Sequence, residues 1–175
     1  AASSTPDIVA CQTSRCDRVQ RRVLCLLLLV ILGVPAGLLP PLARADLFYV
    51  SYYAQARIER FNSAGVDLGP FAVTPRSGKA GLAFNPSAEL FASTGSGNSI
   101  HKFSTGGAAS VHLNTGLGFP FGLAFDSGGN RLYVANTGNN QIVRVSPTGV
   151  PSVWASTGLS GPVAVAFDHA GNLYV

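Results

Sequence analysis

After residue 45 the chain contains no cysteine, because Cys11, Cys16 and Cys25 all lie before that point. The body of the protein therefore has neither a disulfide framework nor a cysteine-based zinc site. Charge is scarce as well: 11% of the residues are charged, against roughly 25% in an average soluble domain. Together with 20 glycines and a hydrophobic fraction of 47%, the low charge indicates an all-β protein rich in turns and argues against disorder.

A strong charge of one sign is also missing from the body of the chain. The net charge of +4 arises mainly from five arginines and two aspartates within residues 1–45. The remaining residues carry seven Lys or Arg and six Asp or Glu, a net charge of +1. This surface lacks the basic field that nucleic-acid binding requires, so we expect no nucleic-acid partner.

Residues 21–45 read "RRVLCLLLLVILGVPAGLLPPLARA". A basic pair precedes an apolar core over residues 23–32, and small residues flank Arg44 before the mature sequence. This order predicts an N-terminal extension with a secretory signal peptide, cleaved after Ala45. The apolar core is shorter than the roughly 20 residues of a membrane span, although an uncleaved signal anchor remains an alternative because residues 23–42 are mostly apolar. We expect a secreted, periplasmic or cell-surface protein.

The body of the chain repeats itself every 42 residues. The segments "FYVSYYAQARIERFNSAG", "LFASTGSGNSIHKFSTGG" and "LYVANTGNNQIVRVSPTG" begin at Phe48, Leu90 and Leu132. The blocks "GLAFNPSAE" and "GLAFDSGGN" precede the second and third segments, and the block "AVAFDHAGN" follows the third. Such a period, with about four short strands in each unit, is typical of a β-propeller.

In the third unit the pattern predicts strands over residues 122–125, 132–135, 142–145 and 151–155. The segment "NTGNN" (136–140) is either a ligand-binding loop or a hairpin turn between the two middle strands. Because "STGSGNS" occupies the same place in the preceding unit, we interpret it as a turn. Residues 46–175 thus comprise three units and the start of a fourth, too few to close a ring, and are interpreted as a fragment of a larger propeller.

The stretch "PFGLAFDSGGNRLYVANTGNNQIVRV", residues 120–145, resembles an NHL-type propeller repeat. The resemblance extends over residues 46–175 and is strongest from residue 120 onward. It departs from the family pattern at Asn136, where Asp is usual, and at Gln141, where Arg is frequent. Gluconolactonase-like and virginiamycin B lyase-like propellers are wider relatives. The resemblance implies the fold and does not transmit an activity.

Acidic or amide residues recur where the first strand of each unit ends, at Asn85, Asp126 and Asp168. Oxygen ligands from several blades can converge on a propeller channel and bind Ca²⁺ or another divalent cation, as the resemblance to lactonase-like propellers implies. The alternative is turn chemistry, because each residue stands at the first position of a turn.

Basic residues recur at the same spacing, at Arg60, Lys102 and Arg144. In a propeller they would form an arc of positive charge with one member per blade, which is a candidate binding face. The alternative is that they belong to the solvated face of the third strand of each unit.

The remaining titratable residues show no catalytic pattern. The two glutamates, Glu59 and Glu89, occupy different positions of the repeat, and we interpret both as solvated. The histidines His101, His112 and His169 share no register, and we interpret them as isolated surface or turn residues without metal-ligand spacing. The sequence contains no nucleophile elbow and no phosphate-binding loop.

We therefore predict an exported NHL-type propeller that acts as a non-enzymatic binding or scaffold module. Its partner would be an extracellular protein or carbohydrate, and no cofactor is expected. One alternative is a lactonase-like hydrolase or lyase with a divalent cation in the channel. Another is the sensor ectodomain of a membrane protein, anchored by an uncleaved signal or by a C-terminal segment.

Overall fold

The computed structural model describes residues 47–52, 54–73 and 78–175. These ranges contain only β-strands and one 3-10 turn, with no α-helix, so the predicted all-β class is confirmed. The predicted signal peptide and its cleavage site lie outside the described residues. Among the described residues, no helix has the length and apolar character needed to cross a membrane.

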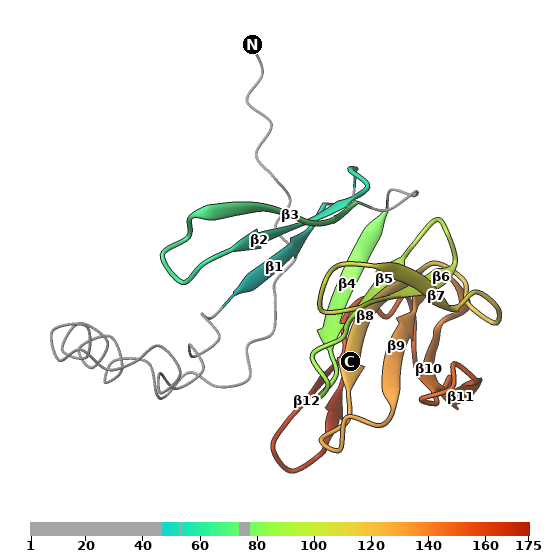
Figure 1. Ribbon diagram of the computed structural model, residues 1–175. Helices are drawn as coiled ribbons and strands as arrows, with labels where there is room; N and C mark the ends of the chain where they lie inside the picture. Colours follow the sequence, from blue (N-terminus) through green and yellow to red (C-terminus); the bar gives the residue numbers. More distant parts are fainter. Residues whose placement is uncertain (1–46, 53, 74–77) are drawn as a thin grey trace, which may run out of the picture.

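The strands form four antiparallel sheets, drawn in Figure 1. The first sheet contains β1 (Phe48–Ser51), β2 (Arg57–Phe61) and β3 (Asp67–Val73). The second contains β4 (Lys79–Phe84), β5 (Leu90–Thr94), β6 (Ser99–Phe103) and β7 (Ala109–Leu113). The third contains β8 (Pro120–Phe125), β9 (Leu132–Asn136), β10 (Gln141–Val145) and β11 (Pro151–Ala155), and the fourth contains β12 (Ala166–Phe167) and β13 (Leu173–Tyr174).

Each sheet is a blade, and its strands follow one another in space in the order of the sequence. A blade and a sequence unit do not begin at the same strand. The units that start at Leu90 and Leu132 begin with β5 and β9, whereas the blades begin one strand earlier, with β4 and β8. The second and third blades have four strands, whereas the described residues supply three strands of the first blade and two of the fourth. The first strands β4 and β8 contact each other, as do β8 and β12, so these strands line the inner edge of the array (Figure 1).

The predicted strands of the third blade are confirmed to within two residues at each end. The "NTGNN" segment is the predicted turn: Asn136 at the end of β9 pairs with Gln141 at the start of β10. A 3-10 turn (Thr137–Asn139) connects them, and Asn140 adopts a left-handed conformation with φ of 52°.

Aromatic rings connect neighbouring blades in a repeated pattern. In each case a ring from the last strand of a blade contacts a ring on β1, β5 or β9, the equivalent strands of the three blades. That second ring contacts a phenylalanine on the first strand of the next blade. Ring centroids lie 5.0 to 5.5 Å apart in all of these contacts. The three sets are Phe71, Tyr49 and Phe84; His112, Phe91 and Phe125; and Trp154, Tyr133 and Phe167.

Hydrogen bonds also connect the second blade to the third and the third blade to the fourth. The Oδ1 atom of Asn98, in the middle turn of the second blade, accepts the backbone N–H of Phe119 at 2.7 Å. In the third blade, Asn140 accepts the N–H of Gly161 at the same distance. Both asparagines have positive φ, a conformation that Asn tolerates better than most residues. The middle turns therefore connect the blades and also reverse the chain.

Candidate ligand site between the second and third blades

A polar cavity of about 290 Å³ lies between the second and third blades, on the side where the first strand of each blade turns into the second. The second blade supplies the turn after β4 together with side chains from β5, β6 and β7. The third blade supplies the corresponding turn after β8 and the turn after β10. The polar lining residues are Asn85, Ser87, Glu89, Lys102, His112, Asn130 and Ser146, and the large apolar ones are Phe91, Phe125 and Leu132.

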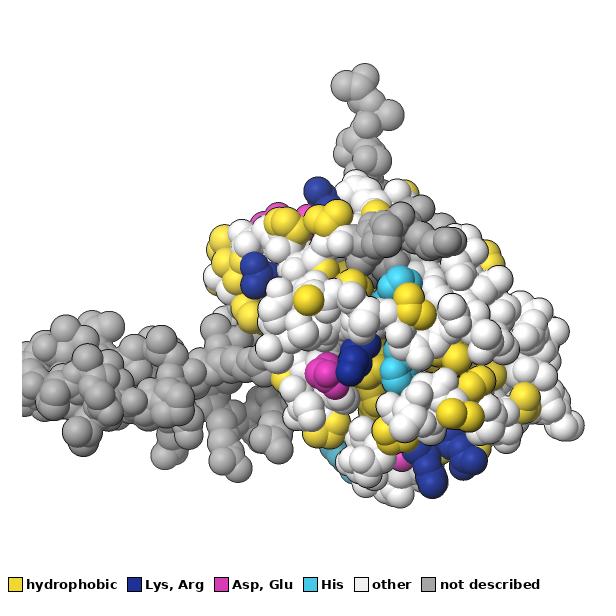
Figure 2. All heavy atoms as spheres, turned by 45° about the vertical axis from the view of Figure 1, so that its right-hand side comes forward, with side chains coloured by type: hydrophobic (Ala, Val, Ile, Leu, Met, Phe, Trp, Pro, Cys, Tyr) yellow, Lys and Arg dark blue, Asp and Glu magenta, His cyan; other side chains and the backbone are white. Residues whose placement is uncertain are grey.

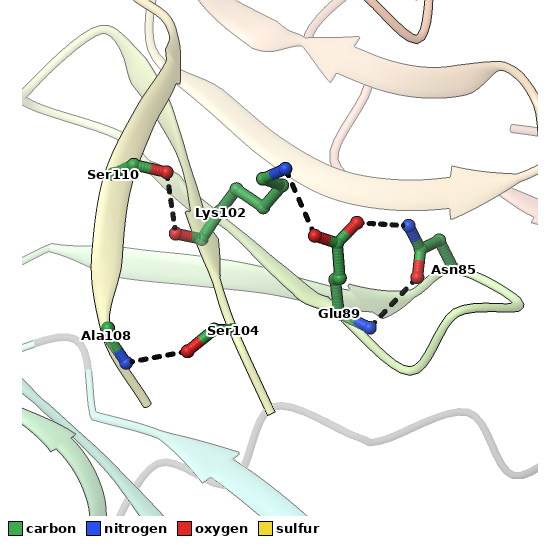
Figure 3. A network of polar contacts seen from close by, with 6 residues as sticks. All are labelled: Asn85, Glu89, Lys102, Ser104, Ala108 and Ser110. Carbon is green, nitrogen blue, oxygen red and sulfur yellow. Dashed lines mark hydrogen bonds and ion pairs between the residues drawn. The ribbon is translucent and has the colours of Figure 1, made fainter. Parts of the chain in front are cut away.

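A hydrogen-bonded network holds the charged groups of this cavity in place (Figure 3). The Nδ2 atom of Asn85 donates to Oε2 of Glu89 at 2.8 Å, and the backbone N–H of Glu89 donates to Oδ1 of Asn85 at 2.9 Å. The other carboxylate oxygen of Glu89 forms an ion pair with Nζ of Lys102 at 3.1 Å. Glu89 thus orients a cation that comes from a different strand. Figure 2 shows an acidic and a basic side chain side by side near a histidine on one face of the protein.

The hydrogen bond from Asn85, followed by the one from Lys102, lowers the pKa of Glu89 below its ordinary value of 4.5. Glu89 is therefore ionised at neutral pH and its charge compensates that of Lys102. Since both side chains keep about a third of their surface exposed, solvent screens the pair and its contribution to stability is small.

The imidazole of His112 forms another part of the cavity wall and packs edge-on against Phe91, with centroids 5.0 Å apart. Burial, followed by the positive charge of Lys102, lowers the pKa of His112 below 6.5. Glu89 and the backbone of Ser146 act in the opposite direction with smaller effects. His112 is therefore neutral at pH 7, with one ring nitrogen that can donate a hydrogen bond and one that can accept.

Replacing His112 by Phe is expected to remove a pH dependence of stability. The pKa of His112 is lower in the folded protein than its ordinary value of 6.5. At a pH between the folded-state pKa and the unfolded-state pKa, the unfolded chain therefore binds more protons than the folded protein. The free energy of unfolding consequently falls as the pH decreases through this window. We expect the wild type to lose more stability than His112→Phe between pH 7.5 and pH 5.5. Urea unfolding at both pH values measures the difference. Glu89 does not interfere, because its lowered pKa affects stability only below about pH 4.5. Equal losses in both proteins would contradict this prediction.

Two residues of the cavity depart from the internal repeat. His112 occupies the place that Phe71 and Trp154 occupy in the other ring sets. Glu89, at the end of its turn, accepts a hydrogen bond from Asn85 at the start. In the fourth blade the acid and the amide exchange places, and Asn172 donates to Asp168. Glu89 and His112 therefore distinguish the cavity from the equivalent places in the other blades.

The predicted metal ligands all lie in turns. The Oδ1 atoms of Asn85, Asp126 and Asp168 each accept a backbone N–H from their own turn, at 2.8 to 2.9 Å. Asn85 and Asp126 also line a second cavity, of about 630 Å³, together with His169 and the ends of β4, β8 and β12. Across the described ranges, no group of three His, Cys, Asp or Glu side chains is placed to hold a metal ion.

The predicted basic residues lie in register on β2, β6 and β10, the strand before the last in each of the first three blades. Each is directly opposite an aromatic residue of the second strand: Arg60 pairs with Tyr49, Lys102 with Phe91 and Arg144 with Tyr133. The guanidinium of Arg60 lies 6.0 Å from the ring centroid of Phe71. Of the three, only Lys102 lines the cavity described above.

Two interpretations of single residues from the sequence are wrong. Glu59 is not solvated: it is 3% exposed and forms an ion pair with Arg57 at 2.8 Å. His101 is not a surface or turn residue: it is 7% exposed on β6 and lies 3.2 Å from the hydroxyl of Ser99. Both residues lie on a middle strand of their blade, Glu59 on β2 and His101 on β6, where tertiary packing buries even polar positions.

Comparison with known proteins gives the fold and no family. No protein-family model matches the chain, and no curated protein matches it. Among solved structures, a chain of a nidogen/laminin complex is 26% identical, with a TM-score of 0.64 over 73% of this chain and 51% of that one. An inactive variant of virginiamycin B lyase from Staphylococcus aureus, bound to quinupristin, is 20% identical, with a TM-score of 0.61 over 77% and 50%.

A third structure, of a protein described as a candidate gluconolactonase, is 23% identical, with a TM-score of 0.54 over 67% of this chain and 41% of that one. These neighbours are β-propellers that include both binding proteins and enzymes. The chain spans about half the length of the structures it matches. Its four antiparallel sheets, the contacts between their first strands and these likenesses together show that the chain has the fold of a β-propeller, with blades of about 42 residues.

Proposed function

We propose that this chain is part of an exported, NHL-type propeller that acts as a non-enzymatic binding module in a secreted, periplasmic or cell-surface setting. The observation that carries the proposal is the polar cavity between the second and third blades. There Glu89 and His112 depart from the repeat, and Glu89 forms an ion pair with Lys102 and a hydrogen bond with Asn85. Such an arrangement of polar and apolar groups can hold a ligand.

Export rests on the sequence of residues 21–45, and the binding role agrees with one of the structural neighbours. That neighbour is a chain of a nidogen/laminin complex, so a propeller of this fold occurs in a protein complex there. For this chain the proposed partner is an extracellular carbohydrate or protein, and no cofactor is required. Since the body of the chain carries a net charge of +1, nucleic acid is not a proposed partner.

The second candidate function is a lactonase-like hydrolase or lyase. It is favoured by the second cavity, where Asn85, Asp126 and His169 lie beside the inner strands, and where oxygen ligands could bind Ca²⁺ or another divalent cation. Neighbours described as a lyase and as a candidate gluconolactonase have the same fold. A third and less specific candidate function is that of a sensor ectodomain tethered to a membrane, which would use the same binding site.

Thermal unfolding of the full chain with a panel of small compounds tests the proposal. The panel contains neutral sugars, amino acids, dipeptides, simple carboxylates and lactones, each with and without Ca²⁺. A binding module predicts that one class raises Tm in a concentration-dependent way and is recovered unchanged by mass spectrometry. Lys102→Met should abolish the rise, whereas the matched variant Arg131→Met, which removes an exposed cation outside the cavity lining, should retain it.

The other outcomes decide against the proposal. Consumption of a lactone, dependent on a divalent cation and on Asp126, would favour the hydrolase. A panel in which no compound raises Tm, or in which the rise is the same in Lys102→Met, would show that this cavity does not hold a ligand.

A further inference from the structure

The charges inside the cavity between the second and third blades cancel one another. The ammonium of Lys102 lies 3.1 Å from the Glu89 carboxylate, and the imidazole of His112 is neutral at pH 7 for the reasons given above. A ligand with a net charge would be attracted by one member of the pair and repelled by the other at nearly the same distance. The site therefore favours a ligand without net charge.

The cavity nevertheless offers many hydrogen-bonding groups. Glu89 supplies only acceptors and Lys102 only donors, while the neighbouring amide, hydroxyl and imidazole groups supply both. A hydroxyl group of a ligand can donate one hydrogen bond and accept others. Adjacent hydroxyls can therefore bridge Glu89 and Lys102, one donating to the carboxylate while its neighbour accepts from the ammonium.

The remaining wall of the cavity is apolar. Phe125 is partly exposed there and lies edge to face with Phe91, with centroids 5.0 Å apart, whereas Phe91 and Leu132 line the cavity with only 4% and 2% of their surface exposed. The volume of about 290 Å³ is at the lower end of the roughly 300–1,000 Å³ of small-molecule sites. The occupant is therefore compact, with an apolar face and a polar rim of hydroxyls.

We infer that this cavity binds a single neutral sugar ring, whose C–H face packs against Phe125 and whose hydroxyls bridge Glu89 and Lys102. The inference rests on the proposed binding function and specifies its ligand class. The paired charges act as a filter against acidic and basic sugars, and Asn85 keeps the Glu89 carboxylate in position for this role.

Titration of the full chain by calorimetry or ligand-observed NMR tests the inference with three sugars of nearly equal size. These are glucose, glucuronate and glucosamine. The wild type is expected to bind glucose at least tenfold more tightly than the two charged sugars at pH 7.5. Other neutral hexoses, screened in parallel, identify the preferred ring.

Two substitutions should reverse this preference in opposite directions. Glu89→Gln leaves Lys102 unpaired and should favour glucuronate over glucose, whereas Lys102→Met leaves the carboxylate unpaired and should favour glucosamine. A variant that had merely lost its fold would bind none of the three sugars, so the reversal separates the proposed role from a structural one. Arg131→Met, which leaves the pair intact, should keep the preference of the wild type.

The possible failures differ from one another. If amino acids or dipeptides bind in a Lys102-dependent manner and sugars do not, the sugar inference is wrong and the binding function stands. If the wild type prefers glucuronate or glucosamine, the argument from charge cancellation is wrong. If no compound binds, both the inference and the proposed function fail.

Discussion

Gly81→Ala is expected to destabilise the protein by about 3 kcal/mol, with a decrease in Tm on the order of 10 °C. Gly81 lies on β4, where a Cβ atom would overlap the carbonyl oxygen of Phe121 on β8. It would also lie 3.0 Å from the backbone nitrogen of Leu123. Both atoms belong to the main chain and no rotamer change can relieve the overlap, so the two inner strands must separate.

The same substitution weakens a hydrogen-bonded bridge between the two blades. The hydroxyl of Ser93 accepts the N–H of Gly81 at 2.8 Å and donates to the carbonyl of Phe121 at 2.6 Å. Urea unfolding followed by the fluorescence of Trp154, the only tryptophan, measures the loss. The control is Gly106→Ala, where the nearest atom is 3.9 Å from the new Cβ, and we expect a change below about 0.5 kcal/mol. A Gly81→Ala protein as stable as this control would show that β4 and β8 do not approach each other in this way.

Asn136→Leu is expected to lower the free energy of unfolding by about 2 to 3 kcal/mol. The Asn136 side chain is fully buried, and its Oδ1 atom accepts the N–H of Gly118 at 2.7 Å. Its Nδ2 atom donates to the carbonyl of Gly116 at 3.4 Å, a longer and weaker bond. Leucine has a similar volume but leaves both main-chain groups without this partner, and an unpaired polar group inside a protein is costly.

Asn114→Leu provides the comparison for this substitution, because Asn114 is exposed and lies in the same loop region. Its effect is expected to remain within about 0.5 kcal/mol. Hydrogen exchange at Gly118 gives an independent measurement, since the amide should exchange faster in Asn136→Leu and not in Asn114→Leu. Unchanged exchange at Gly118 would contradict the role assigned to the Asn136 side chain.

The 42-residue period was sufficient to predict the fold. Each strand is short and each turn carries Gly, Asn or Asp, so the positions of β9, β10 and β11 followed from local sequence. The middle turn at residues 136–140 was likewise identified correctly, because its counterpart around Asn98 has a similar composition. Local turn chemistry and alternation are short-range properties, which a single sequence expresses well.

The candidate site was harder to predict, since it depends on contacts between blades. Lys102 was singled out because it repeats, whereas its partner Glu89 comes from an earlier turn and was interpreted as solvated. His112 does not occupy the same position of the repeat as the other histidines, so the sequence pattern does not indicate a site there. Aligning it with Phe71 and Trp154 would have revealed a histidine in an aromatic position. The burial of Glu59 and His101 was missed for a related reason: it depends on tertiary packing around the middle strands, which the local sequence pattern does not express.

The hydrogen bonds from Asn98 and Asn140 reach forward in the sequence by the same interval of 21 residues. The second and third units therefore each carry their own connection to the unit that follows. When such a unit is duplicated in a gene, the copy receives the incoming bond from its predecessor and supplies the outgoing bond to its successor. Tandem duplication can thus lengthen the array without any new compensating substitution. The residues that form the connection between two blades are therefore copied together with the repeat that contains them.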